Sequence, residues 1–223
     1  MRCYFKDCQS PATTKEHIPP KSFFPEDQRE QLLTVRSCEL HNNSKSHDDT
    51  YVLAQICLNA SPTNRAREVF QKKILPQLSF NADAFRKTLT KNSTQLPDGV
   101  VRYSVDIERC DAFFSALSFG VIFKANQEPI PSHYSIRHIY HNFVDDSASP
   151  EQKQLEQHIE CIYSGASMQS LNFGCLKFSN STIYTAKIFG LPNFGSSITL
   201  VHTFYGIFKV TSMLTKRSIG YNG

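Results

Sequence analysis

Three short segments near the start of the chain decide how its N-terminal part folds: CYFKDC at 3–8, TTKEHIPPKSFF at 13–24 and CELHNNSKSHDD at 38–49. The first segment holds the pair Cys3-x4-Cys8, and the third opens with Cys38-x2-His41 after a gap of 29 residues. Two such pairs are typical of tetrahedral zinc sites, because each pair supplies two ligands from one turn. We therefore predict that these four side chains bind a structural Zn²⁺.

The composition around these pairs explains why a metal is needed. Residues 1–50 are rich in Pro, Ser, Asn and Asp and lack a sustained helical period. Pro19, Pro20 and Pro25 break any helix there, while Leu32–Val35 fits one short strand. A segment this small buries little apolar surface, so a bound metal has to contribute folding energy.

The other cysteines fit no disulfide framework. The chain has seven cysteines, an odd number, and no apolar signal core follows its first charges. We therefore expect a cytoplasmic protein, in which structural disulfides are rare. The isolated Cys57, Cys110, Cys161 and Cys175 are expected to be small buried hydrophobes.

Several classes of protein are disfavoured. No apolar run reaches ~18 residues, so no membrane span is expected. The sequence lacks the glycine-rich loops G-x-x-x-x-G-K-[ST] and G-x-G-x-x-G and the nucleophile elbow G-x-S-x-G. His133, His138 and His141 lie close together, and we expect them to be partly buried structural residues rather than a second site.

Positive charge is concentrated in one part of the sequence. Residues 1–60 carry seven Lys and Arg against eight Asp and Glu (−1), residues 61–100 carry seven against three (+4), and residues 101–223 carry ten against nine (+1). A basic block suggests a polyanionic partner, because phosphate neutralisation dominates affinity for nucleic acids. The candidate contacts are Arg65, Arg67, Lys72 and Lys73. The alternative is a solvated helix face.

Periodicity and helix breakers predict an α+β protein with a small N-terminal module (1–60), a basic helical segment (61–99) and an α+β region of unassigned role (100–223). The interval Ser135–Phe143 remains ambiguous between helix and strand. We expect helices from Asp48 to before Pro62, from Thr63 or Asn64 to Leu75 with Pro76 as the stop, over Ala82–Thr90 and over Asp111–Lys124. We expect strands over Val100–Ile107, Cys175–Phe178, Ile183–Phe189 and Ile198–Val210.

Two stretches carry a resemblance to a known family: Glu16-His17-Ile18-Pro19-Pro20-Lys21 and Cys38-x2-His41-Asn42-Asn43. In the order of these motifs, residues 1–55 resemble the HNH endonucleases. Their ββα-metal module places an acidic residue and a histidine between two zinc-binding pairs, with a His or Asn directly after the last ligand. The resemblance implies a zinc-stabilised ββα-metal module at the N-terminus, followed by a helical and β-rich region.

The resemblance also implies a role for individual residues. His17 would be the general base, and Glu16 and Asn42 would bind a catalytic Mg²⁺ or Mn²⁺. Other ligands stay open: His47 could replace Asn42, and Asn43 is a further candidate. Asp49 could also replace Asn42, although a favourable charge at the N-terminus of a helix explains this residue better. Hard oxygen ligands suit such an ion, and the ordinary pKa of histidine suits a base at neutral pH.

The function implied by the resemblance is metal-dependent hydrolysis of phosphodiester bonds in DNA, with RNA left open as a substrate. A bacterial defence or toxin effector, held in check by a regulatory protein partner, fits the same resemblance. The alternative is a non-catalytic, zinc-stabilised module that binds nucleic acid or protein. Catalysis requires a divalent cation and His17, whereas binding requires neither.

Overall fold

The protein has an α+β fold, as the sequence predicts. The computed structural model describes residues 2–43, 46–60, 63–80, 83–144, 146–164, 180–190 and 193–217. It has three antiparallel sheets: the hairpin β1–β2, the very short pair β3–β4, and a four-stranded sheet in the order β5-β8-β7-β6. Among the described residues, no helix is both long and apolar enough to cross a membrane.

An antiparallel hairpin and two helices form the N-terminal part. Strand β1 (Thr14–His17) pairs with β2 (Thr34–Ser37), which lies two residues further along than the strand predicted at Leu32–Val35. The short 3-10 helices η1 (Lys21–Phe23) and η2 (Glu26–Gln28) connect the strands, and α1 (Glu39–Asn43) and α2 (Ser46–Asn59) follow them.

The helical middle begins as predicted and continues past the expected stop. Thr63 caps α3 (Asn64–Val69), where its hydroxyl accepts a hydrogen bond from the backbone N–H of Ala66 at 3.2 Å. The stop predicted at Pro76 is wrong. The chain passes through the π-helix η3 (Phe70–Ile74) into α4 (Leu75–Leu78), and Pro76 lies in the first turn of α4, where an N–H has no partner within the helix. Helix α5 (Ala84–Leu89) follows.

The strand predicted over Val100–Ile107 is also wrong. Only two residues, Val101–Arg102, form β4, which pairs with β3 (Thr94–Gln95). Ile107 instead begins α6 (Ile107–Asn126), because the side chain of Asp106 caps the helix by accepting a hydrogen bond from the backbone of Arg109. The predicted buried helix is confirmed and extends further at both ends.

The four-stranded sheet contains β5 (Tyr134–Tyr140), β6 (Tyr184–Phe189), β7 (Ile198–Phe204) and β8 (Phe208–Lys216). The single strand predicted over Ile198–Val210 is two strands, because Tyr205 (φ 51°) and Gly206 (φ 76°) form a tight turn between β7 and β8. The strand predicted at Cys175–Phe178 lies outside the described residues.

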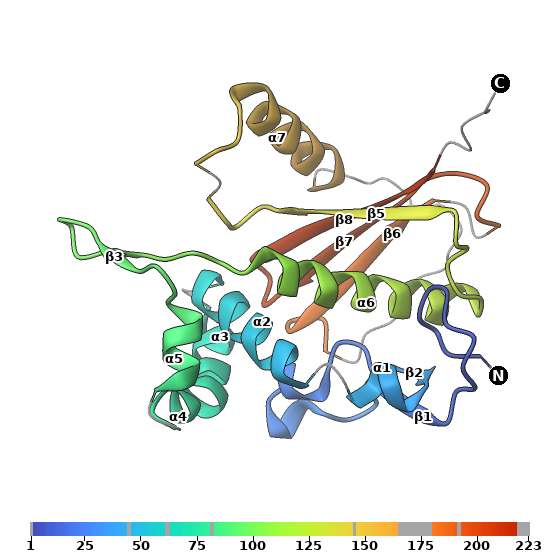
Figure 1. The fold of residues 1–223 in the computed structure, drawn as a ribbon, viewed down its shortest axis with the longest axis horizontal. Coiled ribbons are helices and arrows are strands. Elements are labelled where there is room, and N and C mark those ends of the chain that lie inside the picture. Colours follow the sequence, from blue (N-terminus) through green and yellow to red (C-terminus); the bar gives the residue numbers. More distant parts are fainter. Residues whose placement is uncertain are drawn as a thin grey trace.

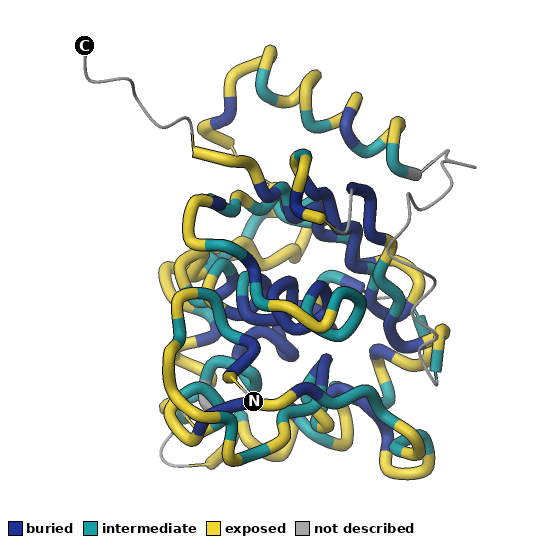
Figure 2. The backbone as a smooth tube through the Cα atoms, turned by 90° about the vertical axis from the view of Figure 1, so that its right-hand side faces the viewer, coloured by how far each residue is buried: buried dark blue, intermediate teal, exposed yellow. Residues whose placement is uncertain are grey.

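Helix α6 is the centre of the molecule. It lies under one face of the four-stranded sheet, with α7 (Pro150–Ser164) across the opposite face and the N-terminal part beneath it (Figure 1). The buried backbone follows α6 and the sheet strands (Figure 2). At Gly120 of α6, an added Cβ would lie 2.7 Å from Cγ2 of Ile18, so the helix and the chain after β1 are in close contact.

The cysteines outside the N-terminal pairs differ in burial. Cys57 and Cys110 are buried, as predicted. The prediction for Cys161 is wrong: this residue of α7 is exposed, whereas Ile159 of the same helix is buried. Cys175 lies outside the described residues.

Two histidines lie between α6 and the sheet, His202 buried and His138 partly buried, and both ring nitrogens of each contact hydroxyl groups. His202 contacts Ser118 Oγ (3.0 Å) and the Tyr184 hydroxyl (2.8 Å). His138 contacts Ser115 Oγ (2.9 Å) and Ser212 Oγ (2.8 Å). Of the clustered histidines, His138 and His141 are therefore structural side chains, since His141 contacts Thr211 Oγ1 at 2.9 Å.

This pair of histidines predicts acid sensitivity. Burial lowers the pKa of His138 to about 4, and burial together with the charge of His138 lowers that of His202 to about 3, against an ordinary value of 6.5. Below pH 6.5 the two imidazoles bind protons in the unfolded chain but not in the folded protein. The free energy of unfolding is therefore unaffected by these histidines above pH 6.5 and decreases as the pH falls towards 4. Each pH unit in this window costs roughly 1.4 kcal/mol per histidine.

We therefore expect the melting temperature of the protein to fall steeply between pH 6.5 and pH 4. The variant His202→Gln keeps an amide in place of the ring nitrogens but cannot titrate, so its melting temperature should depend less on pH in this window. Calorimetry at several pH values measures the effect. If the melting temperature of His202→Gln depended on pH as strongly as that of the wild-type protein, titration of His202 would not be the cause of the acid sensitivity.

Candidate functional site

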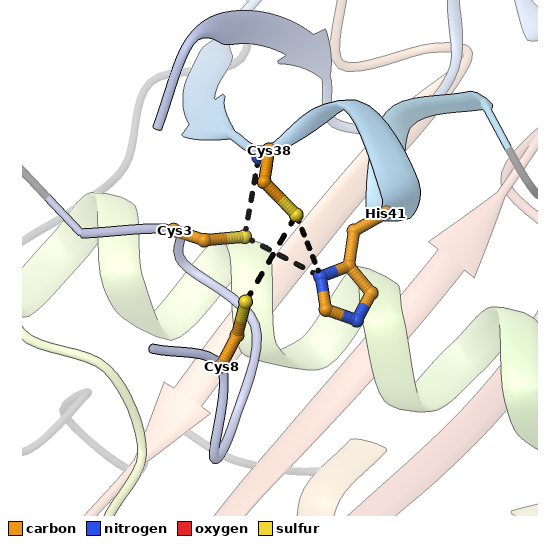
Figure 3. Close-up of side chains that lie close together, drawn as sticks. All are labelled: Cys3, Cys8, Cys38 and His41. Carbon is orange, nitrogen blue, oxygen red and sulfur yellow. Dashed lines mark hydrogen bonds between the residues drawn. The ribbon is translucent and has the colours of Figure 1, made fainter. Parts of the chain in front are cut away.

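The four predicted zinc ligands lie together. One donor atom of each residue, Cys3, Cys8, Cys38 and His41, lies within 4.8 Å of the donor atoms of the other three (Figure 3). The Sγ atoms of Cys8 and Cys38 are 3.9 Å apart, and Nδ1 of His41 lies 3.2 Å from Sγ of Cys38 and 3.6 Å from Sγ of Cys3. The predicted cluster of three cysteines and one histidine, called the Cys3His cluster below, is confirmed.

These distances fit a tetrahedral zinc ion. With zinc–sulfur bonds of ~2.3 Å and zinc–nitrogen bonds of ~2.0 Å, tetrahedral angles require ligand atoms about 3.5–3.8 Å apart. The three measured distances, 3.2, 3.6 and 3.9 Å, lie within about 0.3 Å of this range, and three thiolates with one imidazole are a donor set that zinc favours. Four protein ligands leave no open position, so the cluster is consistent with a structural zinc ion.

Local structure brings the two pairs together. Cys3 and Cys8 flank a loop at the chain start, and a bridge between Arg2 and Pro11 closes that loop. Cys38 directly follows β2, and its backbone N–H donates to Sγ of Cys3 at 3.4 Å. In α1, the ring of His41 stacks on Phe5, with ring centres 4.0 Å apart. The stacking on Phe5 therefore fixes the orientation of the His41 ring, which the sequence spacing predicts as a ligand.

A second group of polar residues surrounds a small cavity between β1, α2 and α6. Glu16 and His17 at the end of β1 and Asp49 in the first turn of α2 line it, together with residues of α6. The volume open to the centre of a water-sized sphere is about 10 Å³, which is near the minimum for one bound water. Adjacent strand residues usually point to opposite faces, yet both Glu16 and His17 contribute to this cavity, where the chain leaves β1.

Two carboxylates meet near a buried hydroxyl at this cavity. Burial raises the pKa of Tyr4. The negative charges of Glu16 and Asp49 raise it further, and the Glu16 carboxylate also interacts with the Tyr4 hydroxyl. Tyr4 is fully buried, and like charges in so apolar a setting repel each other strongly unless a cation lies between them. The donor set of two carboxylates therefore fits a hard divalent cation such as Mg²⁺ or Mn²⁺.

His17 is suited to accept a proton. Burial lowers its pKa below 6.5, Lys21 lowers it further, and the charge of Glu16 opposes the shift. The imidazole is thus neutral at physiological pH, which is the state that a general base needs.

The other predicted site residues lie in different places. Asn42 and Asn43 lie on α1, where the N–H of Asn42 donates to the Cys38 carbonyl at 3.0 Å. Within the described residues, neither lines the cavity of Glu16 and His17, whereas Asp49 does. His47 lies at the start of α2, and its side chain is outside the described part of the chain.

The predicted basic contacts are largely engaged with acidic neighbours. Arg65 and Lys72 both pair with Glu68 at 2.9 Å, and Lys73 pairs with Glu26 at 3.1 Å. Arg67 is exposed. The solvated-face alternative therefore describes Arg65, Lys72 and Lys73, and their role as nucleic-acid contacts remains a prediction.

Sequence reasoning did not anticipate the wall of the cavity. Phe113, Ala116 and Leu117 of α6 line it, although they are far from Glu16 in the sequence. Their helical spacing predicts a buried face but not the element against which that face packs. Comparison with models of protein families, with curated proteins and with solved structures finds no match for this chain.

Proposed function

We propose that the protein is a metal-dependent phosphodiester hydrolase of the HNH type that cleaves DNA. The observation that supports this proposal is the convergence of Glu16, His17 and Asp49 on one cavity beside the Cys3His cluster. A hairpin, a helix and a zinc-binding group of this kind agree with the resemblance of residues 1–55 to HNH endonucleases.

The side chains divide the chemistry between them. Neutral His17 accepts a proton from water, and the resulting hydroxide attacks the phosphorus in line with the leaving 3′ oxygen. A divalent cation, when bound, neutralises negative charge that develops on the phosphate and the leaving oxygen. Glu16 and Asp49 would hold such a cation, and the Tyr4 hydroxyl, which interacts with the Glu16 carboxylate, would fix the position of that carboxylate. The Cys3His cluster keeps β1 and α1 in place.

The geometry favours Asp49 over Asn42 as the second ligand. Asp49 lines the cavity and carries a charge, whereas Asn42 lies on α1 behind the last zinc ligand. A carboxylate also binds Mg²⁺ more strongly than a neutral amide oxygen. We therefore assign Glu16 and Asp49 as the ligands of the catalytic cation in this proposal.

The test is cleavage of supercoiled plasmid by the purified full-length chain, with Mg²⁺ or Mn²⁺ added or omitted. Nicking that depends on the added ion would support the proposal, and a parallel assay on RNA determines the substrate. Protein that retains zinc and binds DNA but does not cleave it with either ion would support the non-catalytic binding module instead. Plasmid cleavage measured again with candidate partner proteins added then tests whether a protein partner regulates the activity.

The assignment of Asp49 leads to a separate prediction. In Asp49→Asn, the concentration of Mg²⁺ needed for half-maximal cleavage should rise about 10- to 100-fold, as expected for the loss of an important contact at a metal site. Asn42→Ala is the matched variant, and its Mg²⁺ requirement should stay close to that of the wild-type protein. The reverse result, with Asn42→Ala impaired and Asp49→Asn normal, would show that Asn42 is the ligand.

A further inference from the structure

A much larger cleft lies on the other side of the first turn of α2. It has a volume of about 590 Å³ and is bounded by α2, by the end of α5 with the loop after it, and by the start of α6. Three cationic side chains line it, Lys87, Lys91 and Arg109, against a single carboxylate, that of Asp106. The lining thus carries a net charge of +2, from three positive charges and one negative charge.

The two lysines are available to a ligand. Both are exposed, and in the described part of the chain no ion pair joins either one to a carboxylate. This distinguishes them from Arg65, Lys72 and Lys73, which pair with Glu68 and Glu26. Among the described cations of residues 61–100, Lys87 and Lys91 therefore place positive charge without a carboxylate partner in this cleft, while the exposed Arg67 lies outside it on α3.

Arg109 is held in position by its neighbours. Its Nε lies 3.0 Å from Oδ1 of Asp48, and its guanidinium lies 5.1 Å from the centre of the Tyr51 ring. The Tyr51 hydroxyl also accepts a hydrogen bond from the backbone N–H of Asp106 at 2.8 Å. The wall of the cleft that α2 and α6 form is thus rigid, while the lysines on the opposite wall are long and adjustable.

The cleft is adjacent to the candidate catalytic cavity. Asp48, which pairs with Arg109, directly precedes Asp49, which lines that cavity. On α6, Arg109 of the cleft and Phe113 of the cavity are four residues apart, which is about one helical turn or ~6 Å. The cleft and the cavity thus adjoin along α2 and α6, as a strand that passes from one to the other requires.

We propose that this cleft binds the sugar–phosphate backbone of the nucleic acid strand, with Lys87 and Lys91 contacting phosphates next to the one that is cleaved. This inference rests on the proposed function for the identity of the strand. Lysine acts as a mobile point charge that follows the backbone without reading bases, so the binding is insensitive to sequence. The carboxylate of Asp106 lies at the helix start and repels a phosphate there, so the strand lies nearer the lysine wall.

The test measures binding of a fluorescein-labelled single-stranded oligodeoxynucleotide by anisotropy, over a range of salt concentrations and without added divalent cation. In Lys87→Gln/Lys91→Gln, the slope of log affinity against log salt should fall by about 1.4, or about 0.7 for each lost phosphate contact on a single strand. At ~0.1 M salt this corresponds to binding about 25-fold weaker, since the two lines meet near ~1 M.

The control is Lys153→Gln/Lys187→Gln, which removes the same charge from exposed residues of α7 and β6. Its affinity and salt slope should match those of the wild-type protein. Equal losses in the two double variants, or no loss in Lys87→Gln/Lys91→Gln, would overturn the assignment of the cleft. The same preparations are assayed for plasmid cleavage, so a failure of catalysis is seen separately from a failure of binding at the cleft.

Discussion

Replacement of His17 by alanine is expected to lower the rate of plasmid cleavage by about 10²- to 10⁴-fold, which is the range that a general base contributes. Among the residues that the structure describes, His17 is the one histidine that lines the cavity, and its lowered pKa keeps the ring neutral above pH 6.5. The remaining activity reflects unassisted attack by water near the bound cation. Single-turnover cleavage at saturating Mg²⁺ measures the effect on the chemical step.

The pH profile gives this prediction a second readout. Because the pKa of His17 is lowered, the wild-type rate should rise as pH increases through a value below 6.5 and then level off. His17→Ala should lose that rise. Lys15→Ala is the matched control, because Lys15 lies on the same strand with an exposed side chain and should leave rate and profile unchanged. Full activity in folded, zinc-loaded His17→Ala would exclude this mechanism.

The zinc ligands were predictable from the sequence because their chemistry is local. A close pair of soft ligands indicates half of a metal site by its spacing alone, and two such pairs in a short irregular segment are typical of zinc. The caps at Thr63 and the buried face of α6 were predictable for the same reason, because each depends on residues three or four positions apart.

The role of Asp49 was harder to predict, because a helix N-terminus offers an equally good reason for an acidic residue. A carboxylate in a first turn interacts favourably with the helix dipole wherever the helix lies. Only the packing of α2 on α6, with the end of β1 lining the same cavity, shows that Asp49 lies near Glu16 and His17. Contacts between distant elements follow from the whole fold, and no local pattern encodes them.

The turn between β7 and β8 shows a different limit. Alternation over residues 198–210 is real, but it continues through Tyr205 and Gly206, where the chain reverses. The sequence signal for the turn was Gly206 itself, since a Tyr-Gly pair between two apolar runs is compatible with a hairpin turn. Hydrophobic periodicity outweighed that single residue, and one strand was predicted in place of two.

Removal of one zinc ligand should have the largest effect on stability. In Cys38→Ala, the bound zinc should fall from one ion per chain to none, and the N-terminal part should lose its cooperative unfolding transition. Structural zinc contributes ~10–16 kcal/mol in zinc-finger peptides, whereas a whole domain is stable by only ~5–15 kcal/mol. The loss therefore exceeds what the small hairpin and α1 can tolerate.

Cys110→Ala is the matched control, because Cys110 is equally buried but lies in α6 away from the cluster. It should retain one zinc ion and lose only the stability expected for a small cavity, roughly 1 kcal/mol. Metal analysis and calorimetry of both variants provide the comparison. Cys38→Ala that keeps its zinc and its melting temperature would show that the cluster is not a structural zinc site.

Loss of the zinc should also abolish cleavage, although the four ligands of the cluster have no catalytic role in the proposed mechanism. Strand β1 carries Glu16 and His17, and the residue directly after it, Ile18, packs on Gly120 of α6, so unfolding of the N-terminal part would displace both catalytic side chains.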